Sequence, residues 1–177
     1  LLFSPTGRIN AQEFLRGAYV LVAVSFLINL LPMVSVTIGG LLKMTLIVAI
    51  YCWIALFIKR FHDGGKSGWL CLVPGLVFVF GAWIISTVVP PIFAPELYNN
   101  MQTAMEDVLM SGGDFASVMS ATMEISKEYG EPMAKKIALP QSVILAIWSL
   151  VVGFLSNALI KHDPKKNQYD NPSKTFE

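Results

Sequence analysis

The chain has 177 residues, of which 54% are hydrophobic and only 14% are charged, with a formal net charge of +1. A soluble domain normally carries about a quarter charged residues, so this composition and a mean hydropathy of +0.59 exclude an ordinary soluble protein. The charged residues gather between long apolar runs. This pattern is typical of an all-α integral membrane protein with a single domain of this length.

Four apolar runs are long enough to cross a membrane as helices, at residues 17–38, 41–58, 69–91 and 137–160. A helix rises about 1.5 Å per residue, so about 20 residues cross the hydrocarbon core. The second run is marginal in length. The first run is longer than the apolar part of a signal peptide and lacks a cleavage signal, so we expect a membrane anchor. The chain begins with Leu1 rather than Met, which leaves its natural N-terminus open.

The polar residues of the first run allow two interpretations. Gly39 and Gly40 suit a tight turn that makes the first two helices antiparallel neighbours. Ser25 and Asn29 are four residues apart and share a helix face, which favours hydrogen bonds to a neighbouring helix. The alternative is that they line a pore, helped by a kink at Pro32.

The link between the second and third runs carries the stretch Ile58–Trp69, IKRFHDGGKSGW. Its Gly-Lys-Ser core suggests a phosphate-binding loop, but that loop needs a glycine five residues before Gly65, where the chain has Arg60. We therefore interpret the stretch as a turn at the membrane surface. Gly64, Gly65 and Gly68 let the chain reverse there.

Two His-Asp pairs stand at the ends of the second and fourth runs, His62-Asp63 and His162-Asp163. Two imidazoles and two carboxylates that meet on one surface could bind a divalent metal ion. The interpretation we favour is that the pairs cap helix ends, with the carboxylate of Asp63 accepting from backbone amides of the turn. Cys52 and Cys71 fit no metal motif and are expected to be packing residues.

The segment 92–136 predicts a helical hairpin between the third and fourth membrane helices. Pro95 suits the first turn of a helix, Asp114 suits the N-cap of the next, and Gly130 with Pro132 is expected to end it. Each helix has an apolar stripe that packs on the other helix, lies on the membrane or binds a partner protein. The stripes include Met101, Met105 and Val108 in the first helix, and Phe115, Met119 and Ile125 in the second.

Six of the eight methionines lie in this hairpin. Met101 with Met105, and Met119 with Met123, are four residues apart, and thioether pairs of this kind suit Cu(I). Methionine is also an adaptable packing residue between helices, and this is the interpretation we favour.

Lys and Arg residues are unevenly distributed between the two sides of the membrane. The N-terminal segment, the turn and the C-terminal tail hold nine of them, and the other side holds four. The positive-inside rule then predicts cytoplasmic termini and a periplasmic hairpin. The basic residues, including Lys59, Arg60 and Lys66, are expected to contact anionic lipid head groups rather than nucleic acid.

Three motifs of the chain resemble the YhaH-like bacterial inner-membrane proteins, catalogued as a domain of unknown function (number 805). The resemblance implies the bacterial inner membrane and three motifs that meet at its cytoplasmic face, and it supplies no catalytic residue, substrate or cofactor. Leu15 and Leu70 stand where the family has tryptophan, Asp170 replaces a glycine, and the hairpin is an addition. The motif residues are Gly7, Arg8, Ile9, Glu13 and Phe14; then Lys59, Arg60, Phe61, His62, Asp63, Gly64, Gly65, Lys66, Ser67, Gly68 and Trp69; and Asn167, Gln168, Tyr169, Asp170, Asn171 and Pro172.

The sequence holds none of the common hydrolase or metalloprotease motifs, so we expect a protein that is not an enzyme. Its expected role is an accessory, assembly or scaffold subunit of a larger membrane protein complex. A small transporter or channel-like protein and a metal-handling protein, for copper or a divalent ion, are the alternatives.

Overall fold

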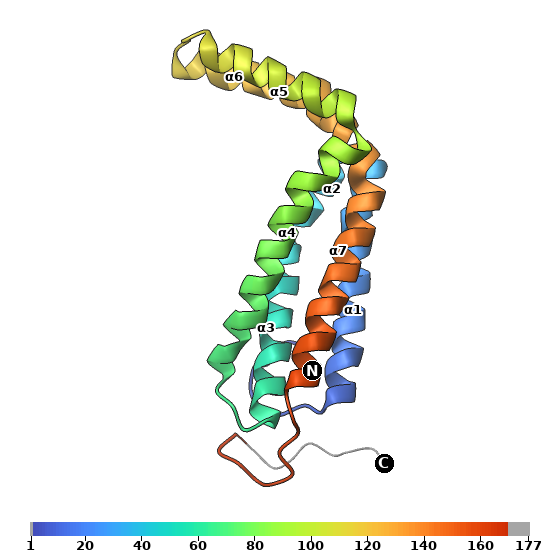
Figure 1. Cartoon of the computed structure of the whole chain (residues 1–177), viewed down its shortest axis with the longest axis vertical. Coiled ribbons are helices and arrows are strands. Elements are labelled where there is room, and N and C mark those ends of the chain that lie inside the picture. Colours follow the sequence, from blue (N-terminus) through green and yellow to red (C-terminus); the bar gives the residue numbers. More distant parts are fainter. Residues whose placement is uncertain (1, 170–177) are drawn as a thin grey trace.

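The computed structural model describes residues 2–169, in which all the regular elements are helices. Four helical spans are long and apolar enough to cross a membrane, at Ala11–Met33, Val36–Asp63, Gly68–Phe93 and Phe115–Leu159. They run side by side (Figure 1), with residues 2 and 169 at one end, the basal end, and a helical hairpin at the other. The predicted all-helical fold, with four helices able to cross a membrane, is confirmed.

The first two spans join through a turn that differs from the predicted one. Helix α1 (Ala11–Leu30) leads into a 3₁₀ turn, η1 (Leu31–Met33), and Ser35 then caps α2 (Val36–Lys43) by accepting from the Ile38 amide at 3.3 Å. The predicted turn at Gly39 and Gly40 is wrong, because both glycines lie inside α2. Pro32 stands in η1, so it ends the first span rather than kinking it.

The second span continues through α3 (Leu46–Asp63), five residues beyond the predicted end at Ile58. A short 3₁₀ helix, η2 (Gly68–Cys71), then opens α4 (Leu72–Phe93). The five extra residues are helical because the backbone hydrogen bonds of α3 continue to Gly64, whose amide donates to the Arg60 carbonyl at 3.3 Å. Five residues of the stretch Ile58–Trp69 that were expected in the link, Lys59 to Asp63, therefore belong to a helix.

The hairpin consists of α5 (Pro95–Met110) and α6 (Phe115–Ile125), and Asp114 caps α6 as predicted by accepting from the Ser117 amide at 2.9 Å. The predicted stop at Gly130 and Pro132 is wrong. The helix continues through the π-helical segment η3 (Ser126–Gly130) into α7 (Glu131–Leu159). Pro132 stands at the start of α7, directly after the π-helical segment.

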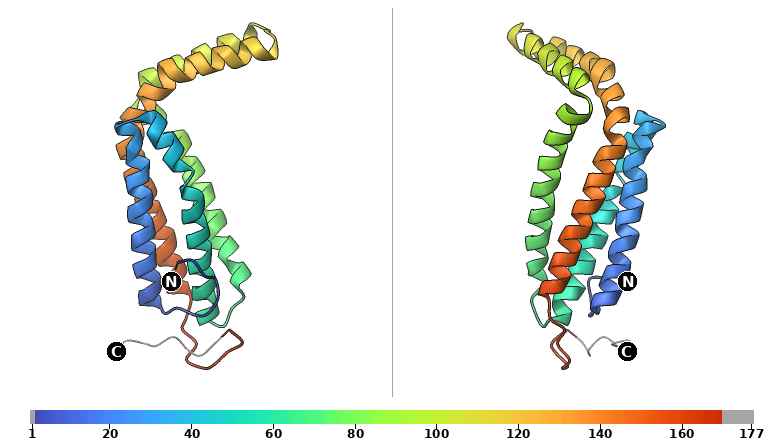
Figure 2. Two further views of the ribbon diagram at one scale, coloured as in Figure 1. Left: turned by 180° about the vertical axis from the view of Figure 1, so that it is seen from behind. Right: turned by 45° about the vertical axis from the view of Figure 1, so that its right-hand side comes forward.

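The apolar stripes of the hairpin pack on each other, the first of the three predicted alternatives. Met101, Met105 and Val108 are half-buried against α6, and Ile125 is 7% exposed. Phe115 and Met119 lie outside this interface and are 82% and 48% exposed. The hairpin leans away from the axis of the spans (Figure 2), so its tip stands clear of them.

Helix α7 is the central element of the spans. It packs along both α1 and α4, while α3 packs on α1. The main apolar core lies at the basal end, where Phe14 and Leu56 are fully buried and Phe14 packs on Phe57 with ring centroids 5.1 Å apart. A smaller core around Val89, Ala94 and Ile137 joins the hairpin to the spans.

Substitution of two adjacent glycines of α2 tests whether the turn between the first two spans is closely packed. A Cβ at Gly39 would lie 2.8 Å from the backbone nitrogen of Pro32, whereas a Cβ at Gly40 would meet nothing within 4 Å. We expect Gly39→Ala to lower the free energy of unfolding by about 1–3 kcal/mol through overpacking, and Gly40→Ala to raise it by up to about 1 kcal/mol through helix propensity. Thermal unfolding of both variants in one detergent measures this, and equal midpoints would contradict the close contact.

Candidate functional site

A buried carboxylate lies at the centre of the basal end. The side chain of Asp63 is 0% exposed, and Arg60 donates to its Oδ2 at 2.7 Å. Arg8 approaches Oδ1 at 3.4 Å, and the Nδ1 of His162 lies 2.9–3.0 Å from both oxygens. Asp63 therefore accepts from three side chains, which its predicted role as acceptor of turn amides did not include. We call Arg8, Arg60, Asp63 and His162 the basal cluster.

Arg60 connects α3 to the last turn of α7. Its Nε donates to the side-chain oxygen of Asn157 at 2.5 Å, and its Nη2 donates to the carbonyls of Asn157, at 3.3 Å, and Ile160. The last carbonyls of a helix have no partner within the helix and carry partial negative charge. The guanidinium group thus caps α7 while its other nitrogen pairs with Asp63.

Arg8 holds the segment before α1 against the tail that follows α7. Its guanidinium donates to the carbonyls of Lys165, at 2.9 Å, Asp63, at 3.1 Å, and Asp163. The amide of Asp163 also donates to the Asp63 carbonyl at 2.9 Å. The segment before α1, the end of α3 and the tail after α7 are therefore held together by hydrogen bonds to backbone atoms as well as by ion pairs.

His62 makes different contacts from His162. Its ring stacks on Tyr169 with centroids 3.7 Å apart and planes within 6°, and its Nδ1 lies 3.3 Å from the Gly7 carbonyl. The side-chain amide of Asn167 donates to the His62 carbonyl at 3.1 Å. The structure thus brings together all three motifs of the family resemblance, although Asp170, Asn171 and Pro172 lie outside the described residues.

The turn itself is tightly packed. Gly65 has a φ of +67°, which a side chain would strain, and a Cβ at Gly68 would lie 2.9 Å from Ile58 and 3.0 Å from His62. Lys66, Ser67 and Trp69 are exposed.

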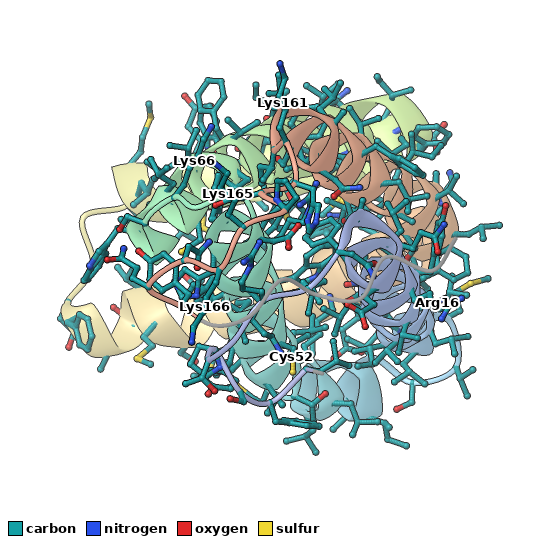
Figure 3. All side chains as sticks on the ribbon, turned by 90° about the horizontal axis from the view of Figure 1, so that it is seen from below. Arg16, Cys52, Lys66, Lys161, Lys165 and Lys166 are labelled. Carbon is teal, nitrogen blue, oxygen red and sulfur yellow. The ribbon has the colours of Figure 1, made fainter. Side chains whose placement is uncertain are left out.

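The predicted head-group contacts divide into two kinds. Lys59 and Arg60 are 4% and 3% exposed, so their predicted contact with lipid head groups is wrong: the final turns of α3 face the protein interior. Lys66 is exposed and lies near Lys165 at the basal end (Figure 3), as a head-group contact requires.

The two His-Asp pairs meet at the basal end, but their four side chains do not converge on one point. Asp63 contacts His162, whereas His62 faces Gly7 and Tyr169. The Lys165 amide donates to the Asp163 carboxylate at 3.0 Å and lowers the pKa of that group. Within residues 2–169, no three His, Cys, Asp or Glu side chains gather as a metal ion would need. The geometry favours a structural cluster over the metal hypothesis.

Two contributors to the basal end were missed in the sequence. Asn157 lies in an apolar run and is 8% exposed; a lone amide one turn before a helix end was the available signal. Asn10 and Glu13 form a capping box that starts α1, with reciprocal bonds of 2.8 and 3.1 Å. Their spacing marks a helix start at Ala11 rather than at Gly17.

Comparison with known proteins identifies the family. The profile of a family described as "Protein of unknown function (DUF805)" matches residues 2–171. The chain belongs to this family. No curated protein and no solved structure matches it. The suspected DUF805 membership is confirmed, and the match spans the basal cluster, all four spans and the hairpin.

Asp63 is the residue on which the basal cluster depends. Asp63→Asn keeps the shape but leaves two buried guanidinium groups without their carboxylate, and we expect the free energy of unfolding to fall by about 3–5 kcal/mol. Asp163→Asn, in the tail segment beside Asp63 and more exposed, is the control and should change stability far less. Unfolding in detergent compares the two variants, and equal losses would show that the buried pairing does not matter.

Proposed function

We propose that this DUF805 protein is a non-catalytic, multi-pass protein of the bacterial inner membrane that acts as an accessory, assembly or scaffold subunit of a larger membrane complex. The basal cluster supports a structural role for the charged motif, because its carboxylate is sealed from solvent and saturated by protein donors. A catalytic or metal-binding carboxylate needs an accessible oxygen. The function of the protein is therefore expected to lie on its exposed surfaces rather than in the basal cluster.

The tip of the hairpin carries this proposal. Leu109, Met110 and Phe115 are 70%, 77% and 82% exposed there, and they lie outside the interface between α5 and α6. Exposed apolar side chains gathered at one place mark a contact surface.

The charge of the hairpin indicates what kind of surface the tip contacts. Residues 92–136 carry seven acidic side chains and three lysines, a net charge of 3 − 7 = −4. An anionic membrane surface repels this charge, whereas a protein with an apolar pocket and a basic rim attracts it. We therefore infer that the tip binds the periplasmic part of another membrane protein.

The two alternative functions have less support in the geometry. Asn29 donates to the Ser25 carbonyl of its own helix at 2.8 Å, a bond within the helix rather than the predicted one to a neighbouring helix. Met101 and Met105 are used in packing between α5 and α6. Copper binding by that pair would have to displace the hairpin interface.

The proposed orientation has cytoplasmic termini, since the basal end holds most of the Lys and Arg residues. A reporter that is active only in the cytoplasm should therefore work when fused after residue 177 and fail when inserted at Gly112–Gly113. A cysteine-accessibility scan with an impermeant reagent gives an independent check. Labelling of the basal end from outside intact cells would contradict the orientation.

The partner proposal is tested in cells with photo-crosslinking residues at the tip. Positions 110 and 115 should crosslink to the same membrane protein, whereas position 102, exposed on α5 away from the tip, should not. Phe115→Asp should abolish that adduct, because a charge in an apolar pocket is unpaired. Gln102→Glu is the matched control for added charge.

The same adduct must appear in stoichiometric amounts after mild purification. A tip that crosslinks to nothing but lipid, or an adduct that Phe115→Asp leaves unchanged, would overturn the proposed function.

A further inference from the structure

A second unexplained surface lies among the membrane spans. An apolar groove of about 330 Å³ opens between α3 and α4, with α7 behind it. Its lining includes Trp53, Ile54, Phe57, Cys71, Gly75 and Val152. Ser149 is a polar residue in the lining, and its hydroxyl donates to the Leu145 carbonyl of its own helix at 2.7 Å. The surface of the groove is therefore mostly carbon, and the hydroxyl hydrogen of Ser149 is already used within its own helix.

The groove exists because α4 packs along α7 but not along α3. Gly75, in the first turns of α4, contributes to the opening: a Cβ built there meets nothing within 4 Å. Protein interiors are close-packed, so a space of this size in the spans must be filled by something from the membrane.

We propose that this groove binds one acyl chain of an anionic phospholipid whose head group lies at the basal end. The occupant must be apolar, because the lining is almost wholly carbon. It must reach the groove from the bilayer, because the rim is open to the side. An acyl chain is narrow, flexible and apolar, and it matches the lining.

The rim of the groove gives the chain direct access from the bilayer. Ile50, Leu76 and Val79 line it and are 57%, 70% and 63% exposed, so they face the hydrocarbon of the membrane. A lipid tail can enter sideways without crossing a polar barrier. The site does not depend on the hairpin or on its proposed partner.

The charge near one end of the groove selects the head group. The groove reaches Cys71 and Leu72, which follow directly on the turn that holds Lys66. Lys66, Lys161 and Lys165 gather at this end of the molecule (Figure 3), and all three are exposed. An ammonium group at the membrane surface attracts anionic lipid, whereas a zwitterionic head group gains less. Trp69, 79% exposed, suits the interface beside it.

Native mass spectrometry of the purified full-length chain tests the proposal. The probe is palmitoyl-oleoyl phosphatidylglycerol, with the matching phosphatidylcholine as the neutral comparison. We expect a single phosphatidylglycerol to be retained after other lipids have been stripped, with phosphatidylcholine retained far less.

Gly75→Leu fills the open space and should weaken retention about tenfold, the effect of losing about two buried methylene groups. Gly40→Leu, at the other glycine of a membrane helix with open space around it, is the matched control and should bind like the original protein. Lys66→Gln should reduce the preference for phosphatidylglycerol over phosphatidylcholine. A melting curve of each variant shows whether it is folded, and Ile54→Trp on the opposite wall serves as a second plug if Gly75→Leu is not.

Equal retention by the plugged and control variants would overturn the groove as the site and leave only annular lipid. Equal retention of the two phospholipids would overturn the anionic head group.

Discussion

The burial of one carboxylate beneath two guanidinium groups is the constraint on which the basal end depends. Asp63 is one negative charge beside Arg8 and Arg60, so the carboxylate alone does not balance them. The remaining positive charge is met by backbone carbonyls at the end of α7 and in the tail after it. Those carbonyls are in place only when α7 and the tail are folded against α3. The cluster is thus stable only as a whole, and a buried charge left without its partner is strongly destabilising.

This arrangement explains why a charged, glycine-rich motif occurs in a protein with so few charged residues. Arg60 and Asp63 are three residues apart on one helix face, so α3 delivers both to the same point. The turn that follows must then reverse within a few residues, beneath the docked tail. A side chain at Gly65 would lie 3.3 Å from Asp163. The glycines of the motif serve this packing, and no phosphate or nucleotide is needed to account for them.

The sequence predicted the spans well, because hydrocarbon thickness imposes a length and a composition that hydropathy measures directly. It located the hairpin caps for an equally local reason, since Pro95 starts α5 at its own position and the Asp114 side chain accepts from the amide of Ser117, only three residues away. The end of α3 was missed because hydropathy falls where charge begins, at Lys59, whereas the helix continues. Whether Lys59 and Arg60 face lipid or protein depends on α7, far away in sequence. The sequence pattern alone could not predict that Asn157 lies next to Arg60, because the two residues are 97 positions apart.

The two ends of the molecule differ in how firmly their helices are held. At the basal end α7 is fixed by Arg60, whereas α4 packs mainly on α7. Both α4 and α7 continue into the hairpin: α4 through the fully buried Ala94, and α7 through the π-helical segment. The helix that forms one wall of the groove therefore also supports the hairpin. The proposed lipid tail would contact α4 on the side that α7 leaves uncovered, so filling the groove would restrain the helix that leads into the hairpin.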